Sequence, residues 1–330
     1  MRCYSILVLL VIVCIVPFNA CASSHISNTQ RFMVHKDKTL IFVGQDGDTI
    51  KQYVQKTGLT PTGVMFYTSV QRMEGLLSVI DIGAGPQHGT GLLEQYPNAA
   101  IQIGLYMVDA LNGILAGTFD ANLDILANWL IKADRLVFLR IGYEFDNPDN
   151  HYDPTLYKNA YRHIVTHLYN KGVRNTAYVW HSYTAEKQKY EWNEWYPGDN
   201  YVDWFGASIF STGNIPYAEN FLKVAKRHHK PFMIAESSPM GMYTVHGKKD
   251  WFNHVFRFIN KNNIQTFCYI NSNWDVLPMY KEQHWGDARV EKDQEVMKLW
   301  LEEVRKSRYI KPSSNLFLQL DCHSNYGRHK

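Results

Sequence analysis

Short apolar runs alternate with amphipathic helical patterns along most of the chain. The runs are rich in Val, Ile, Phe and Tyr, and their length and composition are typical of buried strands. We expect eight strands, at residues 40–45, 62–67, 101–107, 136–142, 176–181, 203–210, 231–235 and 264–271. Eight βα units in about 300 residues favour an α/β fold of the (β/α)8 TIM barrel type over an open doubly wound sheet.

The amphipathic segments between these runs predict helices. The clearest covers residues 154–170, because Asp153 can cap it, Pro154 suits its first turn and Gly172 follows its end. Its apolar stripe is expected to consist of Leu156, Ala160, Ile164 and Leu168. Two further helices are expected at residues 249–261 and at about 288–307.

Two segments depart from the regular alternation. Residues 68–100 are too many for a simple helical return, and we expect an excursion over the barrel mouth. The glycine-rich stretch 83–89 within it lacks the G-x-G-x-x-G spacing of a dinucleotide site. The tail after Lys311 is expected to pack on the barrel and to fray near Ser324.

Residues 1–22 have the pattern of an export signal, with Arg2 before an uninterrupted apolar run at residues 6–16. That run is shorter than the roughly 20 residues that span a bilayer. Ala20-Cys21-Ala22 fits cleavage after Ala22, whereas residues 18–21 also fit a lipoprotein site with a lipid on Cys21. Residues 23–330 would then form a single catalytic domain that is secreted, periplasmic or anchored as a lipoprotein, with membrane contact only if Cys21 is lipidated.

Charge and cysteine content exclude some classes of protein. The net charge is +3, and losing Arg2 with the export signal leaves +2, which gives no nucleic-acid footprint. Cys268 and Cys322 remain beyond the signal, so this is no disulfide scaffold, although a bond between the two stays open. Aromatic residues make up 14% of the chain, which suits either a carbohydrate binder or a large aromatic core.

Two of the expected strands lead into a glutamate, Glu144 after strand four and Glu236 after strand seven. They lie 92 residues apart, which matches three βα units of about 30 residues and places both on the C-terminal rim. Such a pair can act as acid/base and nucleophile on a glycosidic bond. Arg140 lies on the face of Glu144 and would keep one carboxylate ionised. Alternation along the strand turns Tyr143 away from that face.

These motifs resemble those of clan-A glycoside hydrolases. Arg140-Ile141-Gly142-Tyr143-Glu144, Ile234-Ala235-Glu236 and the segment at residues 195–206 are similar to glycoside hydrolase family 26, over residues 40 to 305 or so. The resemblance indicates a divergent member or a related family. It implies a retaining enzyme that cleaves β-glycosidic bonds of a polysaccharide or oligosaccharide by double displacement, with Glu144 as the general acid/base and Glu236 as the nucleophile. The family holds mannanases and some enzymes acting on mixed-linked glucans and 1,3-xylans.

Three positions differ from the family pattern. Tyr143 stands where the family has His, Phe210 where it has a Tyr that supports the nucleophile, and Ser208 where it has an acidic residue. These positions shape the subsite of the reacting sugar. We therefore expect little or no activity on β-1,4-mannan.

Further rim residues are candidates for sugar binding. Besides Arg140 and Tyr143, they are Asp46, His88, Tyr106, Trp180, His181 and Trp274, which end strands or lie in loops beyond them. Trp274 follows strand eight and could be an aromatic platform under the sugar or part of the core. Asp46, Tyr106 and His88 could instead satisfy backbone groups at the mouth.

Other kinds of activity have less support. A non-catalytic carbohydrate-binding barrel is the main alternative, since Phe210 and Ser208 replace family residues. The 14 His include no H-E-x-x-H pattern and no G-x-S-x-G occurs, so we expect neither a metal, nor a cofactor, nor a serine nucleophile. The polymer, its linkage, endo or exo action and the oligomeric state stay open.

Overall fold

The computed structural model describes residues 32–35, 37–185, 191–316 and 320–321. The expected export signal, Cys21 and Cys322 lie outside this part of the chain. Eight parallel strands form a closed barrel in which each strand pairs with its neighbours in chain order. The barrel strands are β2 (Leu40–Gly44), β3 (Gly63–Ser69), β6 (Ala100–Tyr106), β7 (Val137–Ile141), β8 (Thr176–Ser182), β9 (Trp204–Ile209), β10 (Phe232–Ser237) and β11 (Thr266–Ile270). The predicted TIM barrel and its eight strands are confirmed.

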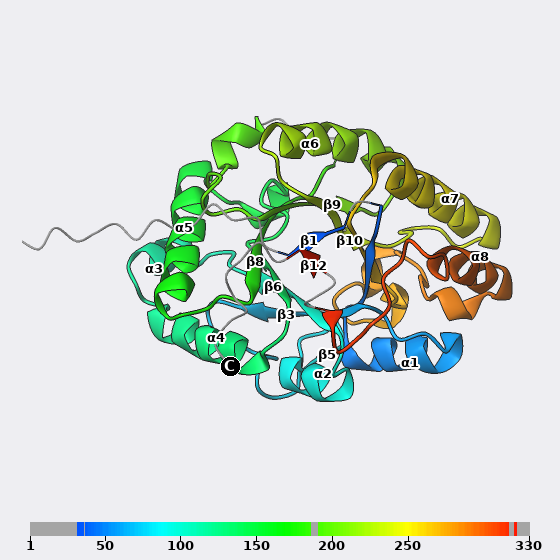
Figure 1. Cartoon of the computed structure of the whole chain (residues 1–330), viewed down its shortest axis with the longest axis horizontal. Helices are drawn as coiled ribbons and strands as arrows, with labels where there is room; N and C mark the ends of the chain where they lie inside the picture. The colour runs from blue at the N-terminus through cyan, green and yellow to red at the C-terminus, as the bar shows by residue number, and fades with distance from the viewer. Residues whose placement is uncertain (1–31, 36, 186–190, 317–319, 322–330) are drawn as a thin grey trace, which may run out of the picture.

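Helices surround the barrel as a ring (Figure 1). They are α1 (Gly47–Thr57), α2 (Gly89–Gln95), α3 (Leu111–Leu115), α4 (Asp120–Ala133), α5 (Pro154–Asn170), α6 (Ile215–Arg227), α7 (Val245–Asn262) and α8 (Gln294–Val304). Short 3-10 helices cover Pro148–Asn150, Trp192–Trp195, Thr212–Asn214, Trp274–Val276, Lys281–Gln283 and Val290–Lys292. Among the described helices, none is long and apolar enough to cross a bilayer.

The helix expected at residues 154–170 is α5, and its start is capped as predicted. The Asp153 side chain accepts a hydrogen bond from the Leu156 amide at 2.8 Å, and Pro154 occupies the first position. Its buried face differs from the expected stripe, because two large aromatic side chains, Tyr157 and Tyr161, are buried while Leu156 is only partly so. The last helix, α8, is shorter than expected because the chain before it forms a 3-10 turn.

The side-chain alternation of the strands divides the core into two apolar layers. Inward-facing residues such as Phe42, Phe138 and Trp204 fill the lower barrel, with ring centroids of neighbouring pairs 5.2 to 5.6 Å apart. Outward-facing residues such as Trp180 pack between the barrel and its helices. The packed lower barrel makes the fold a scaffold with a solid floor beneath the rim.

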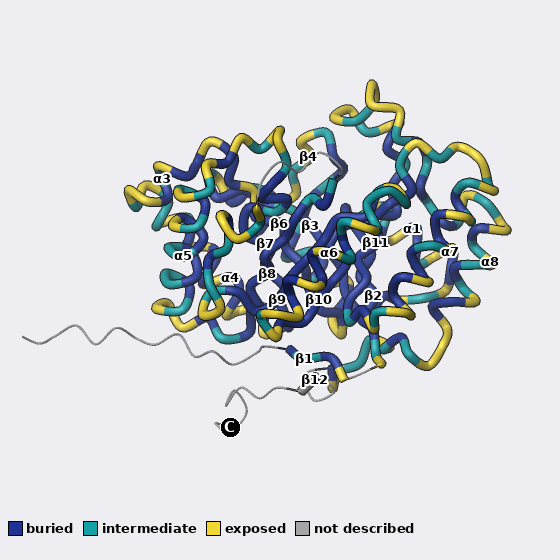
Figure 2. Tube along the Cα trace, turned by 90° about the horizontal axis from the view of Figure 1, so that it is seen from above, coloured by how far each residue is buried: buried dark blue, intermediate teal, exposed yellow. Residues whose placement is uncertain are grey.

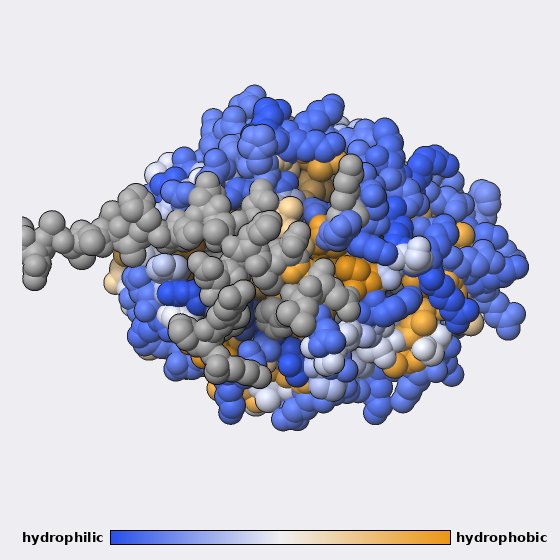
Figure 3. All heavy atoms as spheres, in the orientation of Figure 1, coloured by the Kyte–Doolittle hydropathy of each residue, from blue (hydrophilic) through white to orange (hydrophobic). Residues whose placement is uncertain are grey.

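The two ends of the described chain meet beneath that floor. Strand β1 (Met33–Val34) pairs antiparallel with β12 (Leu320–Asp321), and Phe32 and Leu320 are buried against the barrel interior. Figure 2 shows both strands at one end of the barrel, with β4 at the other. The tail therefore packs on the barrel as predicted at Leu316 and Leu320. Seen in the orientation of Figure 1, the surface is mostly hydrophilic over the surrounding helices, with hydrophobic residues nearer the middle (Figure 3).

The excursion between β3 and β6 is an antiparallel pair of short strands followed by a helix. Strands β4 (Ile80–Asp81) and β5 (Pro86–Gln87) pair with each other, and α2 then returns the chain to the barrel. The amide of Tyr67 donates to Gln87 Oε1 at 2.9 Å, and the amide of Met279 donates to Gly83 O at 3.0 Å. These bonds attach the excursion to the rim.

Candidate active site

Glu236 faces the barrel interior because of a bulge in its strand. Met233 and Ala235 point into the barrel core, so regular alternation would turn the next residue outward. The pairing of β10 with β9 shifts register between Ile234 and Glu236, which places Glu236 opposite Ser208. A bulge changes the direction in which the following side chain points. It sets the Glu236 carboxylate, only 6% exposed, at the top of the packed floor.

Arg140 is the charge partner of Glu236. It points inward from β7, is fully buried, and its Nη1 donates to Glu236 Oε1. Its guanidinium carbon lies 5.0 Å from the ring centre of Tyr67 and 5.1 Å from that of Tyr143. The buried cation therefore packs against two aromatic rings and pairs with one carboxylate. Arg140 has no exposed surface, so no described contact supports its expected role in sugar binding, which stays a prediction.

Glu144 is held just beyond the end of β7 by its own backbone. Its φ of 52° and that of Gly142, 53°, end the extended strand. Asn150 Nδ2 donates to the Glu144 carbonyl at 2.8 Å, and Asn147 Nδ2 donates to Glu144 Oε2 at 3.1 Å. The side chain is 9% exposed and therefore combines burial with access to the mouth.

A line of hydrogen bonds joins the two carboxylates through His181 and Ser208. Arg140 Nη1 lies 3.3 Å from His181 Nδ1, and His181 Nε2 lies 2.9 Å from Ser208 Oγ. Ser208 Oγ in turn donates to Glu144 Oε1 at 2.6 Å. Because an arginine can only donate, Nδ1 is the acceptor, and the Nε2 proton must point to Ser208. Each hydrogen bond in this line is therefore donated toward Glu144, from Arg140 to His181, from His181 to Ser208 and from Ser208 to Glu144.

The pKa values of the site residues are shifted in different directions. Burial, followed by the nearby charge of Glu236, raises the pKa of Glu144 to about 8, against the opposing hydrogen bond from Ser208. Burial, helped by the charge of Arg140, lowers the pKa of His181 well below its usual value, so the imidazole is neutral. One carboxyl group is thus protonated near neutral pH while the other is paired with a cation, which is the division that acid/base and nucleophile chemistry requires.

Asp146 fixes the loop that carries Glu144. Its carboxylate accepts hydrogen bonds from Ser182 Oγ at 2.6 Å, from the Tyr183 amide at 2.6 Å and from Trp192 Nε1 at 3.0 Å. Burial raises its pKa to about 6. The loop after β7 is therefore fastened to the end of β8, beside His181.

Tyr143 was expected to point away from Arg140, and this is wrong. Its ring lies over the guanidinium and 5.4 Å from the ring of Tyr67, with an interplanar angle of 69°. Alternation holds only for extended backbone, and the positive φ of Gly142 turns the chain one residue earlier. Gly104 leaves room for the Tyr67 ring and the Arg140 guanidinium, because a Cβ at residue 104 would lie 2.5 Å from the ring and 3.0 Å from Arg140 Nη2.

Three predicted sugar-binding residues are built into the scaffold instead. Trp180 is buried outside the barrel and stacks on Phe145 at 4.4 Å, and Trp274 is 1% exposed, with Nε1 donating to Ser238 Oγ at 2.9 Å. Asp46 accepts from the amides of Asp48 and Thr49 and caps α1. Buried indoles and a capped helix explain these residues without substrate.

The other predicted sugar-binding residues are His181, Tyr106 and His88, and they differ in exposure. His181 is buried in the hydrogen-bonded line and does not reach solvent. Tyr106 is 40% exposed, with its ring 6.4 Å from that of Tyr143, and stays a candidate for sugar contact. His88 is partly exposed, and its Nε2 lies 3.3 Å from Leu77 O in the excursion. No described contact joins His88 to either glutamate.

Several site residues escaped sequence reasoning. Around Trp274 lie two partly exposed rings, Tyr280 at 4.8 Å and Trp285 at 5.1 Å, which offer the aromatic surface that Trp274 does not. Nearby charge from Glu236, after burial, raises the pKa of Tyr280. Ser208 was expected to shape the subsite of the reacting sugar, and the structure adds its hydrogen bond to Glu144.

A TIM barrel with two buried, differently charged glutamates at the ends of its fourth and seventh strands is the arrangement of a barrel glycoside hydrolase. Residues 146–253 match glycosyl hydrolase family 26. A beta-1,3-xylanase, TXYA, from Vibrio sp. is 32% identical over 314 residues, 85% of this chain and 68% of that protein. A beta-1,3-xylanase from Alcaligenes sp. is 31% identical over 93% of this chain and 71% of that protein. The chain belongs to glycosyl hydrolase family 26 and is a glycosyl hydrolase.

Solved structures agree with the fold. The GH26 beta-mannanase BoMan26A from Bacteroides ovatus has a TM-score of 0.66 to this chain at 15% identity, and the alignment covers 89% of this chain and 95% of the mannanase. At that identity the likeness concerns the barrel alone. The family match and the relatives favour a glycosyl hydrolase over the alternative of a non-catalytic binding barrel.

Proposed function

We propose that this chain is a retaining β-1,3-xylanase, with Glu144 as general acid/base and Glu236 as nucleophile. The observation that carries the mechanism is the opposite state of the two carboxyl groups: Glu236 is paired with the buried Arg140, while burial and Glu236 raise the pKa of Glu144 to about 8. A retaining enzyme needs one ionised carboxylate to attack and one carboxylic acid to donate.

In the first step, Glu236 attacks the anomeric carbon, the bond from that carbon to the glycosidic oxygen breaks, and Glu144 gives its proton to the leaving oxygen. A covalent ester then replaces the charge of Glu236, which is one of the two causes of the raised pKa of Glu144. The pKa of Glu144 falls as a result. In the second step Glu144 takes a proton from water, whose oxygen attacks the anomeric carbon and frees Glu236.

The substrate assignment is supported by the two relatives named beta-1,3-xylanase, at 32% and 31% identity. The residue before Glu144 also supports this substrate assignment. Tyr143 occupies this place with a neutral phenol packed over Arg140, where family mannanases are expected to have an imidazole. We therefore infer weak activity, or none, on β-1,4-mannan.

The test is a comparison of purified β-1,3-xylan, β-1,4-mannan and mixed-linked β-glucan as substrates, using wild type, Glu236→Gln and Glu144→Gln. Both variants should lose turnover by at least about 1,000-fold, since nucleophile and acid each supply several kcal/mol. Hydrolysis of mannan at the rate of xylan would contradict the substrate assignment. Activity of Glu236→Gln within tenfold of wild type would contradict the assignment of Glu236 as nucleophile. NMR of fresh product should show the retained anomer.

We also propose that the enzyme is exported. The basis is the pattern of residues 1–22, with a basic start and an apolar run of 11 residues. Expression in bacteria with radiolabelled palmitate distinguishes the two forms of the signal. Label that disappears in Cys21→Ser supports a lipoprotein, whereas unlabelled protein with Ser23 as its first residue supports cleavage after Ala22.

A further inference from the structure

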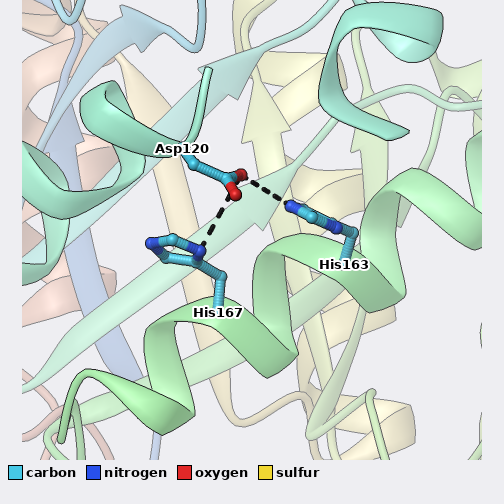
Figure 4. A group of neighbouring side chains, drawn as sticks. All are labelled: Asp120, His163 and His167. Carbon is cyan, nitrogen blue, oxygen red and sulfur yellow. Dashed lines mark hydrogen bonds and ion pairs between the residues drawn. The ribbon is translucent and has the colours of Figure 1, made fainter. Parts of the chain in front are cut away.

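Three side chains with metal-ligand chemistry meet on the outer ring of helices, between α4 and α5. Asp120 is the first residue of α4, and His163 and His167 lie one turn apart on α5. Figure 4 shows both imidazoles turned toward the Asp120 carboxylate from the same side of α5. The expectation of no metal overlooked this pair of histidines, which lie four residues apart on the helix expected at residues 154–170.

The ligand atoms are spaced closely enough to share one ion. Asp120 Oδ1 lies 2.7 Å from His163 Nε2 and 3.8 Å from His167 Nδ1. The three ligand atoms all lie within 4.8 Å of one another. Around a tetrahedral ion with bonds of about 2.0–2.1 Å, ligand atoms lie about 3.4 Å apart. Small side-chain rotations would bring the present distances to that value.

A fourth side chain orients His167. Its Nε2 lies 2.7 Å from Asp124 Oδ1, and Asp124 Oδ2 accepts from Lys171 Nζ at 2.7 Å. A carboxylate that receives the far N–H of an imidazole fixes the tautomer, and metal-binding histidines usually have such a partner. Because His167 Nε2 is bonded to Asp124, Nδ1 is the ring nitrogen that faces the other two ligands.

His167 Nδ1 faces the same carboxylate oxygen as His163. His163 Nε2 donates a hydrogen bond to Asp120 Oδ1 at 2.7 Å. His167 Nδ1 lies 3.8 Å from that oxygen, which is too far for a hydrogen bond. A cation placed between the three atoms would displace the proton between His163 and Asp120 and accept an electron pair from each group.

We propose that Asp120, His163 and His167 bind one Zn²⁺ ion that links α4 to α5, at a site separate from the two glutamates and independent of the proposed substrate. Two imidazole nitrogens and one carboxylate suit Zn²⁺, whereas Ca²⁺ and Mg²⁺ prefer oxygen ligands. The side chains of Asp120, His163 and His167 are 43%, 29% and 15% exposed, so an ion can enter from solvent and keep a water as fourth ligand. The ion would join two neighbouring elements of the ring.

The experiment uses untagged full-length protein, stripped with a chelator and then dialysed, because an affinity tag of histidines would bind the metal itself. Calorimetric titration with Zn²⁺ should give one ion per chain, and saturating Zn²⁺ should raise the melting temperature by a few degrees. Co²⁺ should give the visible absorption of a four-coordinate site. His163→Asn with His167→Asn should abolish all three signals, and Asp124→Asn should weaken binding about 10–100-fold.

His254→Asn is the matched control. His254 and Asp250 form an exposed pair one turn apart on α7, with 3.4 Å between His254 Nδ1 and Asp250 Oδ2. It should bind Zn²⁺ like wild type. Equal binding by wild type and the double variant, or no binding by wild type, would overturn the proposal. If the double variant does not fold, His167→Asn alone answers the question, since loss of its Zn²⁺ signals supports the site and their retention refutes it.

Discussion

Ser208 Oγ donates a hydrogen bond of 2.6 Å to Glu144 Oε1 while it accepts one from His181 Nε2. The serine therefore connects the proposed acid/base to the neutral imidazole that rests on Arg140. Where the family pattern has a charged residue, this chain uses a hydroxyl that can bond to Glu144 without adding a third negative charge to the site.

Ser208→Ala tests this connection. The hydrogen bond from Ser208 lowers the pKa of Glu144, so its loss should raise that pKa further and shift the alkaline limb of the pH–rate profile to higher pH. Turnover should fall by about tenfold, because Glu144 loses its fixed orientation. The profile of kcat/KM is the measurement. Ser211→Ala, an exposed hydroxyl in the loop after β9, should leave the limb in place, and an unmoved limb in Ser208→Ala would refute the connection.

Glu144→Gln should stabilise the folded protein at alkaline pH. The pKa of Glu144 is raised from 4.5 to about 8, so the folded state binds the proton more tightly than the unfolded state. Stability from this group is fully present below about pH 4.5 and is lost as pH rises toward 8. At pH 9 the variant should melt at a higher temperature than wild type, because its free energy of unfolding is higher by on the order of a few kcal/mol. At pH 4.5 the two proteins should melt at nearly the same temperature. Equal melting temperatures at pH 9 would contradict the raised pKa.

Arg140→Met should be severely destabilising. It leaves Glu236 buried without its cation, and breaking a buried pair from one side costs about 3–5 kcal/mol. Urea unfolding measures this. The double variant with Glu236→Gln should lose less than the two single changes together, because each single change leaves one buried charge unpaired and the double variant leaves none. Lys261→Met, which breaks an exposed pair with Glu219, should change the free energy of unfolding by less than about 1 kcal/mol.

Trp274→Ala and Trp285→Ala should have different effects. Trp274 is buried, so truncation leaves a cavity and should cost about 3–5 kcal/mol of stability, with a smaller effect on binding. Trp285 is partly exposed beside Tyr280, and its truncation should weaken oligosaccharide binding about tenfold with less loss of stability. Thermal melting and oligosaccharide titration on both proteins give the comparison. A reversed pattern would restore Trp274 as the sugar platform.

The sequence was sufficient to predict the barrel and the position of both glutamates. Apolar runs mark the strands, and three βα units between Glu144 and Glu236 bring them to the same rim, where Arg140 now links β7 to β10. These features depend on length, composition and spacing, which a sequence records directly.

The directions of individual side chains could not be predicted. Glu236 points inward because of a register shift, and Tyr143 covers Arg140 because of the positive φ at Gly142. Both are local departures from the extended backbone that alternation assumes. Trp274 and Trp180 were candidates for sugar binding because their burial depends on neighbours distant in sequence, such as Phe145 against Trp180.

The pairing of β1 with β12 has a practical consequence for handling the enzyme. Residues 33 and 321 lie side by side at the end of the barrel opposite β4, beneath the apolar floor. A resin, a membrane or a second domain joined through either residue would therefore hold the protein from behind. The catalytic mouth would then face outward, toward the polysaccharide that the enzyme is proposed to cleave.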